Sequence, residues 1–305
     1  MRFRPFGGSG VAVSSVSLAL QDPKGKMKAA DWARLVVRAM ESGVNAFEIV
    51  EPTQAVLEGL AQALPTVERR LVFVGWRCGF TPMQAARSME FMQGLERTAN
   101  LANIGYLDLV LFDEPAGEPT AGDIAEAMSH FAPLRDERRV RLFGVRGDGE
   151  SIDACIQSAA FDAVAMSYNL TSGWRERLRM KEASRRDIAV IGLEPYPEMM
   201  KTAVKDDGKA AKRSSIWRRA SDPLSGSGSY AFMERTPGWT GEEISLSWVL
   251  TEPALATVQV TAHEEKRMSA LAEVPERDMP SGVAAQIEMA RFSPAPVQGD
   301  RRRAG

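Results

Sequence analysis

The segment 107–145, LDLVLFDEPAGEPTAGDIAEAMSHFAPLRDERRVRLFGV, decides the fold. It begins with an aliphatic run, Leu107–Phe112, and ends with a second one, Val140–Val145. Between them lies a helix-like stretch, Gly122–Phe131. Nearly uninterrupted β-branched and aliphatic runs are typical of strands that are buried on both faces of a parallel sheet. The segment therefore predicts a strand, a helix and a parallel strand.

The same alternation extends in both directions along the chain. Further strands are predicted at Val13–Leu20, Val44–Ile49, Leu71–Gly75, Ala163–Met166, Ala189–Leu193 and Ala256–Val260. Further helices are predicted at Asp31–Glu41, Ala55–Leu64 and Ala85–Leu101. We expect Asp31 to cap the first of these helices and Gly43 to close it. Eight strands that alternate with helices predict an α/β fold, a (β/α)8 TIM barrel with functional residues at the carboxyl ends of its strands.

The bulk composition excludes several classes of protein. The 305 residues are 44% hydrophobic and carry a formal net charge of −2, so no field of the whole chain favours nucleic acid or a membrane surface. The two cysteines, Cys78 and Cys155, cannot form a disulfide framework, and no cysteine or histidine spacing indicates a metal site. We find no apolar stretch of the kind that a signal peptide or a membrane span needs. The expected location is the cytoplasm.

Two regions interrupt the alternation. The segment 197–240 contains no clear strand and is predicted to be a flexible basic loop within a single domain, 1–290. The tail 291–305 contains two prolines and the triplet Arg301-Arg302-Arg303, a composition typical of disorder.

Short motifs in order along the chain carry a family resemblance. The opening segments are Arg2-Phe3-Arg4-Pro5-Phe6-Gly7 and Ala39-Met40-Glu41-Ser42-Gly43-Val44-Asn45-Ala46-Phe47; later ones are Leu95-Glu96-Arg97, Gly105–Leu109, Val140–Val145, Ser167-Tyr168-Asn169-Leu170 and Leu246–Leu250. Together these motifs resemble the bacterial aldo-keto reductases over roughly residues 1–275. The resemblance implies a barrel of aldo-keto reductase type with an N-terminal β-hairpin.

The resemblance also implies where a catalytic tetrad would lie. Family members reduce a carbonyl with hydride from a nicotinamide, using a tyrosine acid, a lysine–aspartate pair and a histidine. Here the aspartate position is Glu48 and the tyrosine position is Thr53, while Arg77 replaces the lysine and Asp113 the histidine. A threonine hydroxyl is a far weaker acid than a phenol, and a guanidinium stays charged in proteins. Asp113 would oppose a developing oxyanion. The expectation is a pseudoenzyme with no catalytic residue.

Glu48 and Arg77 keep a carboxylate–cation pair, which can hold the barrel together without chemistry. A second interpretation makes Glu48 and Asp113 a new acid/base pair of a repurposed enzyme. No nucleophile or set of metal ligands accompanies these two carboxylates.

The resemblance implies a partly retained cofactor site. Arg146, Gly147 and Ala165 replace the family's carboxamide-binding residues, and Leu193 replaces its stacking aromatic, with Tyr196 three residues on. The phosphate and ribose end corresponds to Thr261, Ala262, His263 and Arg267. Arg267 could instead be an ordinary surface residue, and His263 an exposed residue at a helix start. We expect NAD(H) binding, with NADP(H) as the alternative and the nicotinamide end altered.

The basic run within 201–219, which contains Trp217, is expected to bind an acidic protein segment in response to the cofactor, or else to be a solvated loop. Nucleic acid is a weaker expectation, because aromatic residues are sparse there. Within the family, the chain resembles a non-catalytic, NADH-sensing regulator of alphaproteobacterial cell division and cell cycle. That resemblance implies two protein partners, FtsZ and the histidine kinase DivJ. The alternatives are a repurposed enzyme, a residual NAD(P)H-dependent oxidoreductase and an empty scaffold.

Overall fold

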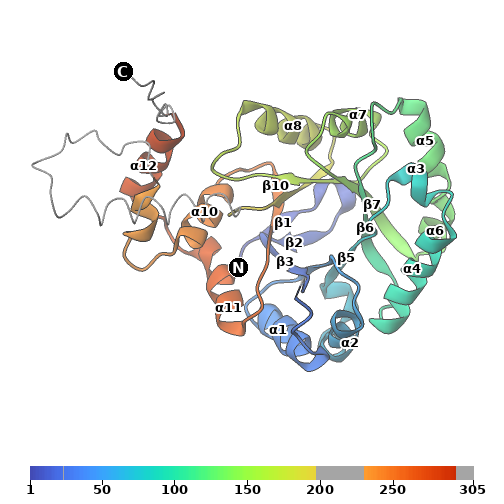
Figure 1. Cartoon of the computed structure of the whole chain (residues 1–305), viewed down its shortest axis with the longest axis horizontal. Helices are drawn as coiled ribbons and strands as arrows, with labels where there is room; N and C mark the ends of the chain where they lie inside the picture. The colour runs from blue at the N-terminus through green and yellow to red at the C-terminus, as the bar shows by residue number, and fades with distance from the viewer. Residues whose placement is uncertain (23, 197–229, 293–305) are drawn as a thin grey trace, which may run out of the picture.

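Eight parallel strands close into a barrel in this computed structural model, which describes residues 1–22, 24–196 and 230–292 (Figure 1). The order around the barrel is β10-β3-β4-β5-β6-β7-β8-β9. The strands are β3 (Val16–Leu20), β4 (Ala46–Ile49), β5 (Phe73–Arg77), β6 (Leu107–Asp113), β7 (Val140–Arg146), β8 (Ala163–Ser167), β9 (Ala189–Leu193) and β10 (Leu255–Val260). All eight runs predicted from the sequence contribute a barrel strand, so the predicted fold class is confirmed.

The first predicted strand, Val13–Leu20, is wrong as a single element. The chain forms β2 (Ala12–Ser14), which pairs antiparallel with β1 (Phe3–Pro5), and then β3. Ser15 divides them, because its amide donates to Arg2 while its carbonyl accepts from Val258 of the barrel. The hairpin that the resemblance implied is therefore present. It places Phe6 against Phe73, with ring centroids 4.7 Å apart, at the amino-terminal end of the barrel.

Helices surround the barrel (Figure 1). They are α1 (Ala29–Glu41), α2 (Gln54–Ala63), α3 (Pro82–Ala85), α4 (Met89–Leu101), α5 (Ala121–Ser129), α6 (Ala132–Asp136), α7 (Ser151–Ser158), α8 (Trp174–Arg185), α10 (Gly241–Val249), α11 (Glu265–Glu273) and α12 (Ser281–Phe292). The helices α10, α11 and α12 lie on the side of the barrel away from α4, α5 and α6 (Figure 1).

Two helix predictions need correction. The predicted helix Ala85–Leu101 is broken, because the Ser88 hydroxyl accepts the Phe91 amide at 3.2 Å and begins α4 there. Asp31 does not cap α1. The N-cap is Lys28, and the Asp31 carboxylate, at the third helical position, accepts the Lys28 amide at 3.0 Å. Gly43 follows the C-cap Ser42 with φ of 87°, a conformation that favours glycine.

The hydrophobic core lies mainly between the strands and the surrounding helices. Phe91, Phe112, Phe131 and Phe143 form one aromatic cluster that joins α4 to β6 and β7. Inside the barrel, Gly144 leaves no room for a side chain, because a Cβ there would lie 2.8 Å from the Ala163 carbonyl oxygen. The barrel is therefore a filled core, and its open chemistry is confined to the strand ends.

The regions that the sequence marked as irregular lie partly outside the described residues. Of the predicted loop 197–240, residues 197–229 fall there, and the rest includes a short 3-10 helix, Ala231–Glu234. Of the predicted tail 291–305, residues 293–305 fall there, while α12 continues to Phe292. Among the described residues, no helix has the length and apolar character needed to cross a membrane.

Candidate functional site

The carboxyl ends of the strands form the barrel mouth, and they carry alternating charges. Glu48 lies near the end of β4, Arg77 ends β5, Asp113 ends β6 and Arg146 ends β7. Parallel pairing fixes this arrangement, since Glu48 is in register with Gly75 and Asp113 with Arg146. Three of the four predicted tetrad positions, Glu48, Arg77 and Asp113, therefore lie with Arg146 at the ends of four consecutive strands on one half of the mouth.

Glu48 belongs to a closed, buried network. The Arg77 guanidinium donates from Nε to Glu48 Oε1 at 2.9 Å, and its second nitrogen lies 2.8 Å from the same oxygen. Gln259, on β10, donates to Glu48 Oε2 at 2.7 Å, and it accepts from Arg77 at 3.4 Å. Both carboxylate oxygens are thus occupied, and Glu48 is only 5% exposed. The predicted Glu48–Arg77 pair is present, whereas the role of Gln259 was not foreseen.

Asp113 has a different partner. Its carboxylate lies 3.2 Å from the Arg146 guanidinium, and both side chains are about a third exposed, at 38% and 34%. Asp113 and Glu48 are therefore held by separate arginines, with β5 between their strands. The geometry does not favour the interpretation in which the two carboxylates form an acid/base pair, because each already accepts from its own guanidinium.

Thr53 serves as the N-cap of α2. Its hydroxyl oxygen accepts the Val56 amide at 3.3 Å, and the backbone turns into the helix at this residue. An N-cap oxygen satisfies one of the free amides of the first turn and is part of the helix start. The side chain at the predicted tyrosine position is thus committed to local structure rather than directed at a reacting group.

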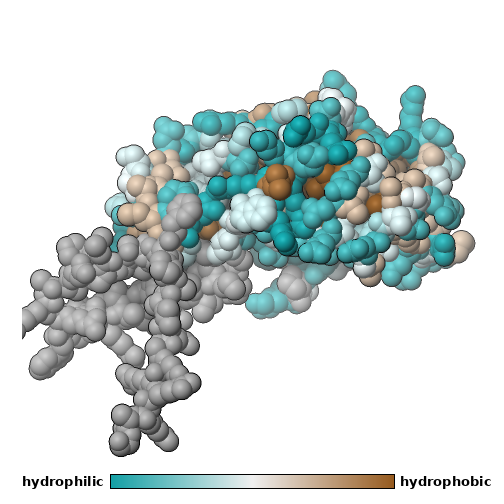
Figure 2. Space-filling model, turned by 90° about the horizontal axis from the view of Figure 1, so that it is seen from above, coloured by the Kyte–Doolittle hydropathy of each residue, from teal (hydrophilic) through white to brown (hydrophobic). Residues whose placement is uncertain are grey.

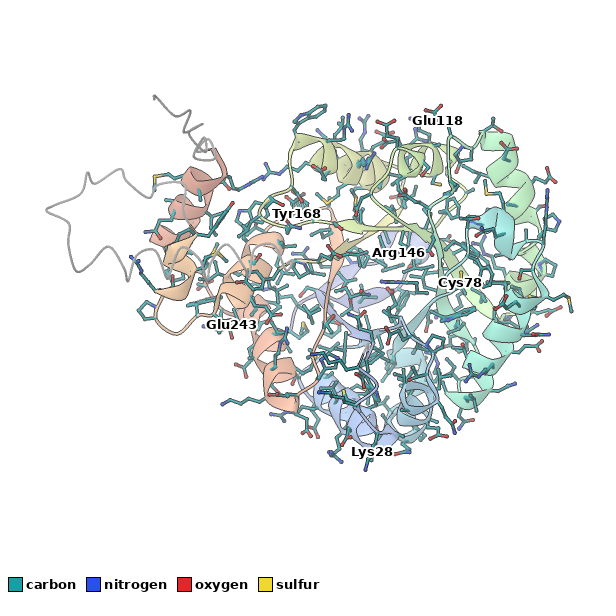
Figure 3. All side chains as sticks on the ribbon, in the orientation of Figure 1. Lys28, Cys78, Glu118, Arg146, Tyr168 and Glu243 are labelled. Atoms are coloured by element: carbon teal, nitrogen blue, oxygen red, sulfur yellow. The ribbon has the colours of Figure 1, made fainter. Side chains whose placement is uncertain are left out.

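Cys78 follows β5 and lies near Asp113, and Figure 3 places it with Arg146 on the β5–β7 side of the barrel. Burial raises the pKa of the Cys78 thiol to about 12, and the nearby Asp113 charge adds to the rise. Burial likewise raises the pKa of Cys155, also to about 12. Both thiols are neutral near pH 7 and are poor nucleophiles. Among the described residues, no group of three or more acidic, histidine or cysteine side chains is placed to hold a metal.

The turn after β7 is fixed by acidic side chains. Glu114 accepts the Gly149 amide at 2.8 Å, and Asp148 accepts both the amide and the hydroxyl of Ser167 at 2.8 Å. A Cβ on Gly147 would lie 1.8 Å from the Glu114 carboxylate, so a side chain at this position would require Glu114 to move away from the Gly149 amide. Gly147 offers no side chain to a carboxamide, and Ala165 is fully buried. The roles of Glu114 and Asp148 were not predicted; in the sequence, Asp148 stands between Gly147 and Gly149, and Glu114 directly follows the strand-end Asp113.

The predicted nicotinamide-stacking position is closed. Leu193 is buried at 6% exposure, and the following backbone is held by Asn169, which donates to the Glu194 carbonyl at 3.3 Å. The Tyr196 hydroxyl oxygen lies close to the start of α10, 2.9 Å from where a Cβ added to Gly241 would lie. Ser245 of α10 donates to the Pro195 carbonyl. Arg146 lies on β7, which β8 separates from β9.

Two of the residues predicted to bind the phosphate end of a dinucleotide contact Gln21, which follows β3. Gln21 donates to the Thr261 hydroxyl at 3.0 Å, and its carbonyl lies 2.9 Å from His263 Nε2. Ala262 is fully buried, and His263 is exposed. Arg267, in the first turn of α11, pairs with Glu242 at 2.6 Å. Thr261 and His263 are therefore linked through Gln21, while Arg267 is held by Glu242 of α10, and α11 begins with no side-chain cap on its first amides.

The barrel mouth fits the phosphate end of a dinucleotide better than the nicotinamide end. Uncapped amides at a helix start, a threonine and an arginine suit a phosphate, although Glu264 and Glu265 beside them reduce the positive potential. At the other end, Arg146, Gly147 and Ala165 present no amide or hydroxyl side chain to a carboxamide. Below the mouth, a mostly apolar cavity of about 20 Å³ lies between Glu48 and Gln259 above and Phe6 and Phe73 below, and it is too small for a substrate.

Comparisons with known proteins agree with this architecture. The aldo/keto reductase family matches residues 17–291. Among solved structures, the chain is similar to an aldo-keto reductase from Klebsiella pneumoniae determined in complex with NADPH. The TM-score is 0.70 at 17% sequence identity, and the match covers 96% of each chain. No curated protein matches the chain. At this identity the structural likeness establishes the fold.

Proposed function

The chain belongs to the aldo/keto reductase family, and we propose that it is a non-catalytic member that binds a nicotinamide dinucleotide and acts through protein contacts. The observation that carries the proposal is the state of the mouth: Glu48 is enclosed by Arg77 and Gln259, and Thr53 caps a helix. Neither side chain is free to supply a proton to a carbonyl oxygen. A site that keeps its shape while its polar groups are paired internally is suited to binding rather than turnover.

Dinucleotide binding is supported at the β10–α11 end of the mouth. The Klebsiella aldo-keto reductase, which has the same fold, was determined with NADPH. In this chain Thr261, the first amides of α11 and Arg267 would hold the phosphates, and Arg267 would exchange Glu242 for the ligand. A bound nicotinamide would supply hydride, whereas Thr53, at the predicted position of the acid, is the N-cap of α2. We favour NAD(H), with NADP(H) as the alternative.

The regulatory part of the proposal rests on resemblance. A barrel with every tetrad position replaced resembles KidO, the alphaproteobacterial regulator that binds NAD(H), FtsZ and the kinase DivJ. In such a protein, dinucleotide binding changes the affinity for a partner only if the dinucleotide binds the partner-binding conformation and the other conformation with different affinities. We propose that this chain couples dinucleotide occupancy to an FtsZ-like or DivJ-like partner in the cytoplasm.

Titration with NADH and NADPH, read by calorimetry, tests the proposal, with a panel of aldehydes and ketones assayed in parallel. We expect saturable binding without detectable oxidation of the cofactor. The Arg267→Ala variant should weaken binding by about tenfold, the value of one charge-assisted contact. Arg186→Ala is the matched control, since Arg186 is also a partly exposed arginine at a helix end, the C-cap of α8, paired with Glu182 at 2.8 Å. Carbonyl-dependent oxidation of NADPH would contradict the non-catalytic proposal, and absence of binding at millimolar concentration would contradict the dinucleotide proposal.

Purified FtsZ and the DivJ kinase domain test the partner proposal directly. We expect binding to at least one of them whose affinity differs with and without NADH. Equal affinity in both conditions would remove the sensing role, and no binding to either protein would remove these two partners.

A further inference from the structure

Helix α8 exposes an apolar pair where a helix of a barrel normally presents polar residues. Trp174 is 74% exposed and Leu178 is 56% exposed. They are four residues apart, so they lie on the same face of the helix, one turn from each other. Neither contributes to the hydrophobic core, which α8 contacts through Met180 and Ala183 on its opposite side. Exposed large apolar residues that adjoin each other mark an interaction site more often than single ones.

Basic side chains continue and flank this pair. Lys181 and Arg185 extend the same helical face, and Arg175 lies beside Trp174; all three are exposed. Lys181 and Arg185 have no ion pair or hydrogen bond among the residues that the structure describes, and Arg175 approaches only Glu150, at 3.8 Å. Residues 174–186 carry six basic and two acidic side chains. We call Trp174, Arg175, Leu178, Lys181 and Arg185 the α8 face.

The helix that carries the α8 face is held rigidly. Arg179 is buried and donates to both oxygens of Asp153, at 2.7 and 2.8 Å, and to the Asp148 carbonyl at 2.7 Å. At the start of the helix, Arg177 donates to the Tyr168 hydroxyl at 3.2 Å, and Arg291 of α12 donates to the Ser172 carbonyl at 2.7 Å. A rigid presentation lowers the entropy that binding would cost.

We propose that the α8 face docks an acidic segment of a partner protein, with Trp174 and Leu178 as the apolar anchors. Tryptophan and arginine are the residues that most often dominate binding energy at protein interfaces. The surrounding uncompensated positive charge complements carboxylates and disfavours basic partners. Figure 2, which looks onto the side where α7 and α8 lie, shows a mostly hydrophilic surface with small hydrophobic spots.

Other occupants fit less well. The basic run at 201–219 has seven basic and two acidic residues, and the tail contains Arg301-Arg302-Arg303, so both share the sign of the α8 face. A lipid surface would require a broad apolar face that can sink among headgroups, whereas α8 offers two apolar side chains and is packed into the barrel on its other side. A nucleic acid would be favoured by a basic domain, and the net charge of this chain is −2.

The test uses the full chain and a short fluorescein-labelled peptide composed of Asp, Glu, Leu and Phe. Fluorescence anisotropy should show salt-sensitive binding. Trp174→Ala combined with Leu178→Ala should weaken it at least about tenfold, as expected for hot-spot residues. Lys181→Glu combined with Arg185→Glu should weaken it to a similar degree and flatten its salt dependence. The matched control is Met89→Ala with Leu71→Ala, whose side chains are 76% and 55% exposed at other sites; it should bind as the unaltered chain does.

Several outcomes would overturn the proposal. They are absence of peptide binding, equal binding by the Trp174/Leu178 variant, or a preference for a lysine-containing version of the peptide. Vesicles of anionic phospholipid and a single-stranded oligonucleotide are tested in the same way, and binding to either that depends on Trp174 would assign the face to that partner instead. Self-association that Trp174→Ala abolishes would assign it to a second copy of the chain. Each variant is also titrated with NADH, so that failure here is distinguishable from failure of dinucleotide binding.

Discussion

The two arginine–carboxylate pairs of the barrel mouth share one chemistry and differ in burial. Glu48 and Arg77 have side chains 6% and 17% exposed, and Gln259 closes their network. Asp113 and Arg146 are 38% and 34% exposed and have no comparable third partner binding the carboxylate among the described residues. A buried pair whose partner is removed leaves an uncompensated charge, while an exposed one is screened by water. The first pair is therefore expected to hold the barrel, and the second to remain accessible.

Arg77→Leu should have the largest effect. It leaves the Glu48 carboxylate buried with Gln259 as its remaining side-chain donor, and we expect a loss of about 3–5 kcal/mol in the free energy of unfolding. Replacing both residues, Glu48→Leu with Arg77→Leu, should cost much less, because no unpaired charge remains. Urea unfolding followed by circular dichroism measures both variants. If Arg77→Leu lowered the free energy of unfolding by less than about 1 kcal/mol, the pair would contribute no more than a surface ion pair does, which would contradict this prediction.

Thr53→Ala should have an intermediate effect on the same side of the mouth. Removing the N-cap oxygen leaves the Val56 amide unsatisfied and should cost about 1 kcal/mol. Thr53→Ser keeps a hydroxyl and should restore most of that stability in the same urea experiment. If Thr53→Ala had no effect on stability but altered ligand binding, the hydroxyl would serve the mouth rather than the helix.

Asp113→Asn should have a small effect on stability, about 0–1 kcal/mol, because the pair is partly exposed to water. The comparison with Arg77→Leu is made in the same unfolding experiment. If Asp113→Asn lowered the free energy of unfolding as much as Arg77→Leu does, the difference in burial would not explain how much each pair contributes to stability.

Cys78 reports on Asp113 more sensitively. Burial and the Asp113 charge both raise the pKa of this thiol, to about 12, so Asp113→Asn should lower that pKa and increase the thiolate fraction at a given pH. Alkylation of Cys78 by iodoacetamide at pH 9, with modified peptides quantified by mass spectrometry, should become modestly faster. Cys155 is the internal control, because its raised pKa depends on burial and Glu114 rather than on Asp113. Equal acceleration at both thiols would indicate loosened structure instead of a charge effect.

The wrong predictions share a physical origin. The run Val13–Leu20 is continuous in hydrophobicity, yet Ser15 divides it, because its amide donates to the Arg2 carbonyl while its carbonyl accepts from Val258 of the barrel. The assignment of Asp31 as an N-cap failed because an acidic residue at the third helical position carries the same sequence signature, and here it accepts the Lys28 amide. Local signals identify an element well and its boundaries poorly, since the boundary depends on hydrogen bonds made after packing.

The sequence by itself determined the eight barrel strands and the order of charges at the strand ends, because buried parallel strands and their termini are marked by local composition. The hairpin was expected only from the family resemblance. Only the tertiary structure decided which charges are enclosed. Gln259 reaches Glu48 across 211 positions of the chain, and it does so because β10 closes the barrel by pairing with β3, the strand next to β4. The commitment of Thr53 to a helix start and of Arg146 to Asp113 likewise depends on backbone geometry at the mouth. Hydrogen-bond partners at a barrel mouth come from strands distant in sequence, so barrel closure selects them.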